Sequence, residues 1–257
     1  MENLFNLPAI SKTGMDKISI SPLDYWYAFE NPNRAPYVKS DDVIFNEALR
    51  CAVFSPNEFS AIYVRQPIIN KKTNLGKSEY NSLMELTQKN NQILLNYDAF
   101  ENIKKMQNAL LSHPTFKKLN IGKVGEPSRF IDKESGAVVK FKPHFINPSG
   151  IILDLSSTKD ASSNTFIKDC AQMNLHKRAA LQLDALDLSV FVFIRVETSE
   201  PYKIGFHYLD DRAISFGRTQ YRENCKVYAE CLKTGKWNGL SEKIQPVSLP
   251  EWVYNKI

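Results

Sequence analysis

The stretch from Gly136 to Phe166 constrains the fold of this chain more than any other, because two strands, a turn and a helix start fit within it. Residues 137–141 alternate apolar side chains with lysine and stop just before Pro143, which predicts a strand buried on one side. Residues 147–150 read Asn-Pro-Ser-Gly and predict the turn that follows, since Pro fixes φ and Gly accepts positive φ. The segment therefore begins with a hairpin.

The second strand of this hairpin carries an unusual acid. Residues 150–155, GIILDL, form an apolar run interrupted only by Asp154, and such a run predicts a central strand buried on both faces. A carboxylate at that position needs a partner or a function. Asp160 and Ser162 are candidate N-caps for a helix that begins near Ser163.

Periodicity predicts the remaining elements of the chain. Two short helices near the N-terminus are opened by Ser11 and by Ser21 with Pro22. Helices are expected over 43–54, 98–116, 163–186 and 210–233, with a helix pair over 79–95, and further strands over 188–196 and 202–208. We predict one α/β (α+β) domain spanning residues 1–257, with a mainly helical part at 1–97 and a sheet-containing core at 98–257.

Composition excludes several classes of protein. The sequence has no run approaching the roughly 20 apolar residues of a membrane helix, and its opening lacks a signal-peptide pattern, so a cytoplasmic protein with no membrane partner is expected. The four cysteines form no CxxC pair, which favours reduced thiols over a disulfide framework or structural zinc. A net charge of +5 permits a polyanionic partner without requiring one.

Several motifs resemble one nuclease family. A hairpin, an acid on the central strand and a helix crossing back are typical of PD-(D/E)XK nucleases, and KFKPH at 140–144 with LDLSSTKDAS at 153–162 is similar to the core of the phage exonuclease VIII (RecE) family, relatives of λ exonuclease. The segments at 10–16, 21–25 and 235–239 resemble the family's opening and closing motifs. The resemblance implies a central mixed sheet flanked by helices, with an N-terminal helical extension, and it implies that homo-oligomers are possible.

The resemblance also identifies six site positions, of which two are retained and four are substituted. The retained acids are Glu126 and Asp154. The substituted positions are Arg50 in place of a His, His144 in place of an Asp, Ser156 in place of a Lys and Arg178 in place of a Gln. The formal charge of the six positions is −2 in the family pattern (three acids and one Lys) and 0 in this chain (two acids and two arginines). Such a site is expected to bind Mg²⁺ poorly, and no cofactor is predicted.

Two functions follow from this comparison. In the first, the chain is a catalytically degenerate exonuclease VIII-like protein of phage or prophage origin that binds DNA, or a protein of the recombination or defence machinery, without cleavage. In the second, it is an active Mg²⁺-dependent 5′-to-3′ double-strand exonuclease with Glu126 and Asp154 as metal ligands and a displaced lysine. The substitutions favour the first.

Basic residues supply candidates for DNA contact. Lys140, Lys142, Lys159 and Arg178 are the predicted DNA-binding residues, and Lys159 lies beyond the expected end of the strand that carries Asp154. If Arg50, Arg178 and His144 converge on the former metal site, they either grip a backbone phosphate or lock the acids into a buried ion-pair cluster.

Overall fold

A computed structural model describes residues 4–70, 72–241 and 243–254, so the first three residues of the opening segment lie outside it. A 3₁₀ turn spans Leu4–Asn6. The helices are α1 (Lys12–Ile18), α2 (Pro22–Phe29), α3 (Asp41–Phe54), α4 (Pro56–Ile62), α5 (Asn74–Lys89), α6 (Tyr97–Ser112), α7 (Pro114–Leu119), α8 (Ser163–Gln172), α9 (Leu175–Leu186), α10 (Asp211–Thr234) and α11 (Glu251–Tyr254). The strands are β1 (Ala9–Ile10), β2 (Tyr63–Arg65), β3 (Ile93–Leu95), β4 (Lys123–Val124), β5 (Ser128–Ile131), β6 (Val138–Phe141), β7 (Phe145–Ile146), β8 (Ile151–Thr158), β9 (Val190–Glu197) and β10 (Ile204–His207).

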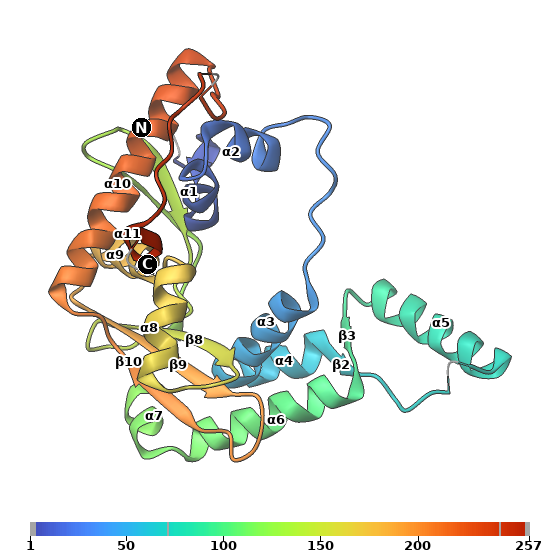
Figure 1. Ribbon diagram of the computed structural model, residues 1–257. Coiled ribbons are helices and arrows are strands. Elements are labelled where there is room, and N and C mark those ends of the chain that lie inside the picture. The colour runs from blue at the N-terminus through green and yellow to red at the C-terminus, as the bar shows by residue number, and fades with distance from the viewer. Residues whose placement is uncertain (1–3, 71, 242, 255–257) are drawn as a thin grey trace.

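A five-stranded mixed sheet forms the centre of the molecule, with strand order β10-β9-β8-β7-β4. The long strands β8 and β9 pair in parallel, and the other neighbours are antiparallel. A second sheet of order β1-β6-β5 includes the N-terminal segment, because Ile10 pairs with Val139. The predicted hairpin of residues 137–141 with 150–155 is therefore wrong, since β6 pairs with β1 and β5, whereas β8 turns back on the short β7 in the other sheet. The predicted mixed sheet flanked by helices is confirmed (Figure 1).

The side chains of β8 alternate between its two faces, and each face packs into a different apolar cluster. Leu153 and Leu155 pack into one apolar cluster with Leu49 of α3 and Met106 of α6. Ile152, on the opposite face, packs into another cluster with residues of α8 and α9. Asp154 has the same parity as Ile152, so it faces α9. The continuous apolar pattern of this strand thus reflects burial on both faces.

Capping residues match the sequence reading at several helix starts. The hydroxyls of Ser11, Ser21 and Ser162 each accept a backbone N–H in the first turn of α1, α2 and α8 respectively. Asp160 is not the cap of α8, and it instead accepts hydrogen bonds from the backbone and hydroxyl of Ser162. A serine at the N-cap satisfies an N–H that the helix itself leaves without a partner.

Two predicted helical segments are wrong as single units. Residues 163–186 form α8 and α9, separated at Asn174, whose φ of 49° is left-handed and is tolerated by asparagine. Residues 98–116 likewise divide, because α6 ends at Ser112 and Pro114 begins α7. Proline suits the first turn of a helix, where its missing N–H costs nothing.

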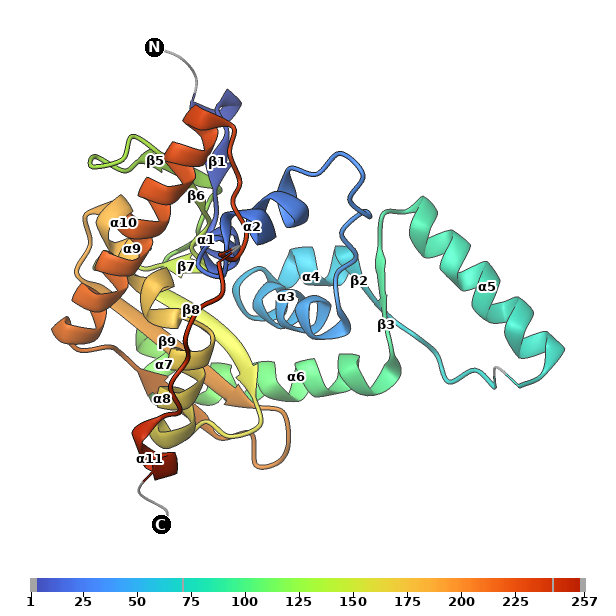
Figure 2. The same cartoon turned by 45° about the horizontal axis from the view of Figure 1, so that its top comes forward.

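The predicted helix pair over 79–95 is also wrong. A single helix, α5, ends at Lys89, and Asn91 then adopts a φ of 53°. The apolar residues that follow form β3, which pairs in parallel with β2. The helix α5 projects away from the remainder of the molecule on these two strands (Figures 1 and 2).

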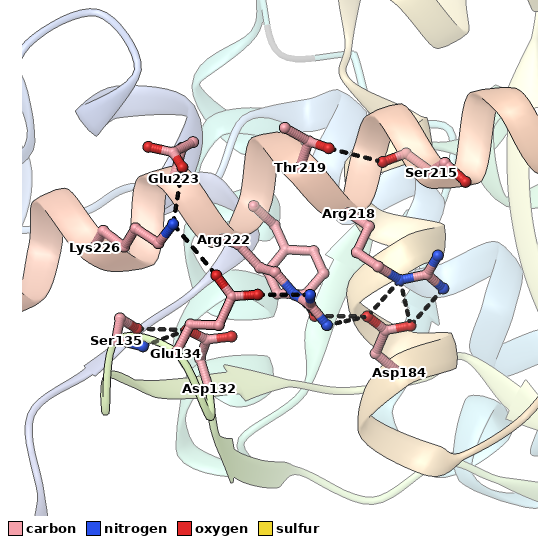
Figure 3. A network of polar contacts seen from close by, with 11 residues as sticks. Asp132, Glu134, Ser135, Asp184, Ser215, Arg218, Thr219, Arg222, Glu223 and Lys226 are labelled. Carbon is pink, nitrogen blue, oxygen red and sulfur yellow. Dashed lines mark hydrogen bonds and ion pairs between the residues drawn. The ribbon is translucent and has the colours of Figure 1, made fainter.

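Polar contacts along α10 tie this helix to its neighbours (Figure 3). Arg218 donates to both carboxylate oxygens of Asp184 of α9, and the hydroxyl of Tyr221 donates to the same carboxylate at 2.7 Å. Arg222 pairs with Glu134, in the turn between β5 and β6, at 2.7 Å. The network fixes α9 and the β5–β6 hairpin to the same helix.

Two observations concern the cysteines and the length of the helices. All four cysteines, Cys51, Cys170, Cys225 and Cys231, are free thiols, and three of them are buried. Within the described ranges, no helix combines the length and apolar character needed to cross a membrane.

Candidate functional site

Asp154 lies on β8 with only 3% of its surface exposed, and its carboxylate has one strong partner. The Nη1 atom of Arg178 donates a hydrogen bond to Oδ2 of Asp154 at 3.0 Å. Arg178 belongs to α9, where the fully buried Ala179 and Ala180 allow the helix to lie close to the sheet. A guanidinium on a buried carboxylate forms a charge-assisted pair, so α9 supplies the main partner of this acid.

His144 lies on the other side of the same carboxylate but forms no ion pair with it at neutral pH. Its Nδ1 atom is 3.5 Å from Oδ2 of Asp154 and accepts the backbone N–H of Leu155 at 3.2 Å. Burial lowers the pKa of His144 to about 3, and the charges of Arg50 and Arg178 act in the same direction. The imidazole is therefore neutral, with its proton on Nε2.

The ionised state of Asp154 follows from these neighbours. Burial raises the pKa of this carboxyl, whereas His144 in its protonated form, Arg178 and Arg50 together lower it by more, so that the pKa lies below its ordinary value. Because His144 is uncharged above pH 3, the two arginines hold Asp154 ionised at neutral pH. The net effect is a buried carboxylate compensated by arginine.

Arg50 is the arginine near Asp154 that does not bond its carboxylate. It lies on α3 and is half-buried, and burial lowers the pKa of its guanidinium. Among the described residues, it forms no hydrogen bond or ion pair that meets ordinary distance limits. It lines a pocket of about 410 Å³, which we call the Arg50 pocket. The charged or titratable side chains of this pocket are Lys39, Glu47, Arg50, Cys51, Glu58, Tyr63, Lys142 and His144.

At position 156, where the resemblance implies a lysine, a cation reaches the serine from the neighbouring strand. Ser156 pairs in register with Arg195 of β9, and Nη1 of Arg195 donates to the Ser156 hydroxyl. Nη2 of the same guanidinium pairs with Asp169 of α8 at 2.6 Å. Arg195 was not identified from the sequence, although a single charged residue in the apolar run 188–196 was a signal for it.

Glu126 does not join this cluster. It is exposed in the connection between β4 and β5, where its backbone carbonyl accepts the Ser128 hydroxyl at 3.0 Å. Its carboxylate makes no hydrogen bond or ion pair with any residue in the described part of the chain. The structure thus brings Arg50, His144 and Arg178 around Asp154 alone.

The predicted DNA-binding residues lie in different surroundings. Lys140 and Lys142 are exposed at the end of β6, and Lys142 lines the Arg50 pocket. Lys159 is exposed just beyond β8, which ends at Thr158. Arg178 keeps about a third of its side chain exposed while it binds Asp154.

The residues present do not fit a Mg²⁺ site. Magnesium requires several hard oxygen ligands in octahedral geometry, whereas the one buried carboxylate here is bound to Arg178 and lies beside a neutral imidazole. Among residues 4–70, 72–241 and 243–254, no group of three or more His, Cys, Asp or Glu side chains could hold a metal ion. Arg178 and Arg50 already compensate the negative charge of Asp154 that a bound Mg²⁺ would otherwise neutralise.

Comparison with known proteins agrees with this fold. Residues 44–250 match the family described as a PDDEXK-like domain of unknown function (DUF3799). The crystal structure of a protein from Eubacterium rectale named "Putative exonuclease" is similar, with a TM-score of 0.60 and 11% sequence identity, over 96% of this chain and 93% of that chain. No curated protein matches the sequence.

Proposed function

The chain belongs to the PDDEXK-like family DUF3799, and from this membership and its site we propose that it binds duplex DNA without cleaving it. In this proposal it is an exonuclease VIII-like protein of phage or prophage origin, with a role in recombination or in countering host defence. DNA binds at the former metal site, and no cofactor takes part.

The observation that carries the absence of cleavage is the hydrogen bond from Arg178 to Asp154. A metal nuclease of this fold needs the acid on its central strand free to bind an ion. Here a guanidinium occupies that carboxylate, and a neutral imidazole stands where the resemblance to the exonuclease VIII family implies another acid. The site retains the frame of a nuclease but lacks the ligands that would activate water.

The Arg50 pocket supports binding of a phosphate. Arg50 and Lys142 line it, and neither has a carboxylate at ion-pair distance among the residues that the structure describes, whereas Lys39 is already paired with Glu47 at 2.6 Å. A guanidinium presents several donors in a fixed plane and matches the oxygens of a phosphate. Burial of part of the Arg50 side chain strengthens that interaction, because fewer waters compete for it.

The dependence of DNA affinity on salt tests this proposal. Anisotropy of a fluorescent linear duplex is measured in EDTA between 50 and 250 mM NaCl, with the unmodified protein, Arg50→Ala and the exposed Arg212→Ala as control. We expect log affinity to fall with log salt, and Arg50→Ala to reduce the slope by about 1, whereas Arg212→Ala leaves it unchanged.

Two other outcomes contradict DNA binding at this pocket. The first is the absence of any salt-sensitive binding of the unmodified protein to the duplex. The second is a lower melting temperature of Arg50→Ala with an unchanged slope. The second result would identify Arg50 as part of a structural ion-pair cluster and would favour a module that binds a protein of the recombination or defence machinery.

A further inference from the structure

A second basic pocket lies beside the Arg50 pocket, on the same strand end. Lys140 and Lys142 are two residues apart, which corresponds to about 7 Å along an extended chain. Lys142 lines the Arg50 pocket, whereas Lys140 lines another pocket, of about 450 Å³, together with Arg34 and Arg129. We call this second one the Arg129 pocket. Residues 140 and 142 therefore contribute one lysine to the lining of each pocket.

The cations of the Arg129 pocket are held in place but are not neutralised. Nη1 of Arg129 donates to the backbone carbonyls of Leu4 and Leu7 at 2.9 and 2.7 Å. Nη1 of Arg34 donates to the carbonyl of Ala28 at 3.1 Å. A carbonyl oxygen orients a guanidinium without cancelling its charge, so both arginines keep a full positive charge in fixed positions.

Strand pairing brings two of these cations together. Arg129 and Lys140 are direct partners in the antiparallel register of β5 and β6, so their side chains lie side by side on one face. Like charges directly opposite each other destabilise a sheet. Within the described chain, neither side chain forms an ion pair with a carboxylate, and the pocket contains only one acid, Glu30. An anion bound between these cations would relieve their repulsion.

We infer that the Arg129 pocket is a second phosphate site, which binds the same DNA strand that occupies the Arg50 pocket. The inference rests on the proposed function and adds the path of the strand. Successive phosphates of one strand are spaced on the scale that separates Lys140 from Lys142, so one phosphate occupies each pocket. A single small anion would occupy only one of the two pockets, whereas a strand with successive phosphates can occupy both.

The test compares salt slopes of three single variants on the same fluorescent duplex. Lys140→Ala and Arg34→Ala each remove one cation of the Arg129 pocket. Lys133→Ala is the matched control, because Lys133 is an exposed lysine in the turn of the same β5–β6 hairpin and lines neither pocket. Arg129 is left intact because it holds the N-terminal backbone. Melting temperatures confirm that each variant is folded.

We expect Lys140→Ala and Arg34→Ala each to lower the slope by about 0.9, whereas Lys133→Ala leaves it at the value of the unmodified protein. A slope for Lys140→Ala equal to that of Lys133→Ala would overturn the second site, even where Arg50→Ala shows that the first one binds. The converse result, with Lys140→Ala effective and Arg50→Ala silent, would leave the Arg129 pocket standing and reject the Arg50 pocket. Absence of any duplex binding rejects both.

A competition experiment separates nucleic acid from acidic polypeptide. Unlabelled poly-glutamate is titrated against the labelled duplex at constant ionic strength, with an unlabelled duplex of matched charge as reference. We expect poly-glutamate to displace the duplex at least tenfold less effectively than unlabelled DNA. Equal displacement, lost in Lys140→Ala, would identify an acidic polypeptide as the ligand of the Arg129 pocket and overturn the inference.

Discussion

The Nη1 atom of Arg178 lies 3.0 Å from Oδ2 of Asp154, so a helix residue occupies the carboxylate that this fold presents on its central strand. The pairing joins α9 to β8 across the interior of the molecule. Asp154 is nearly inaccessible to water and depends on this partner for compensation of its charge. The main consequences for stability, metal binding and catalysis follow from this one contact.

Removal of the arginine should destabilise the fold. In Arg178→Gln the buried carboxylate of Asp154 loses its charged partner. We expect the free energy of unfolding in urea to fall by about 1–3 kcal/mol, less than for a fully buried pair, because the Arg178 side chain is about a third exposed and water can replace part of the lost interaction. Asp154→Asn in the same chain should recover most of the loss. Lys105→Ala, which removes an exposed pair with Glu200 at 3.6 Å, is the control and should cost less than about 1 kcal/mol. Equal losses in Arg178→Gln and the control would contradict the role of this pair.

Metal binding should be weak and should depend on the same arginine. Calorimetric titration of the unmodified protein with Mn²⁺ is expected to show no saturable binding below millimolar concentration, since Arg178 holds the carboxylate of Asp154. The combination of His144→Asp with Arg178→Gln places a second carboxylate, just before β7, beside Asp154 of β8 without the Arg178 guanidinium, and it should bind Mn²⁺ measurably. Saturable binding by the unmodified protein would show that the arginine does not exclude the ion.

The free energy of unfolding should fall as the pH is lowered through the range in which a free histidine titrates. The pKa of His144 is about 3 in the folded chain against about 6.5 when unfolded, so the unfolded state binds more protons between those values and stability rises with pH across that window. From pH 6.5 to 4.5 we expect a loss approaching about 1.4 kcal/mol per pH unit. His144→Asn, whose amide oxygen can accept the N–H of Leu155, should flatten this dependence in urea unfolding.

Two further points bear on that measurement. The groups that face His144 are Asp154, Arg50, Arg178 and Lys142, and none of them changes charge between pH 4.5 and 6.5 in the folded state, because the pKa of Asp154 is lowered below its ordinary value. Burial also lowers the pKa of His207, which contributes a residual slope to both proteins. An unchanged slope in His144→Asn would show that His144 is not held neutral by the fold.

The central strand and its acid were predictable from the sequence, because burial on both faces leaves a local pattern. The run GIILDL located β8, and parity placed Asp154 and Ser156 on one face. Helix divisions at Asn174 and Pro114 were not predicted, since the apolar period continues across both breaks. A left-handed residue interrupts the backbone without interrupting the pattern.

The composition of the site was only partly predictable. Resemblance placed Arg50, His144 and Arg178 near Asp154, and the structure agrees. It also placed Glu126 there, but the loop that carries Glu126 is set by Gly125, where a side chain would lie 2.4 Å from the carbonyl oxygen of Pro143. The approach of Arg195 to Ser156 depends on the register of two strands that are distant in sequence, which no local pattern encodes.

Restoration of a lysine at Ser156 should therefore fail on stability grounds. Ser156→Lys places an ammonium group against the buried guanidinium of Arg195, which already pairs with Asp169. We expect a lower melting temperature than for Ser157→Lys, at the next position of β8, where the hydroxyl bonds the uncharged side chain of Asn46. Arg195→Gln combined with Ser156→Lys should recover part of the difference. A melting temperature for Ser156→Lys equal to that of the unmodified protein would contradict the crowding of charge at this position.

The most direct test of the account follows binding and cleavage of linear duplex DNA in one sample. An end-labelled duplex is incubated with the unmodified protein and Mg²⁺ or Mn²⁺, and each sample is divided between a native gel for binding and a denaturing gel for strand length. We predict a shifted complex in which the strands keep their full length, because Asp154 is bound to Arg178 and the site lacks a set of metal ligands. Progressive shortening of the strands, abolished by Asp154→Ala, would contradict the account.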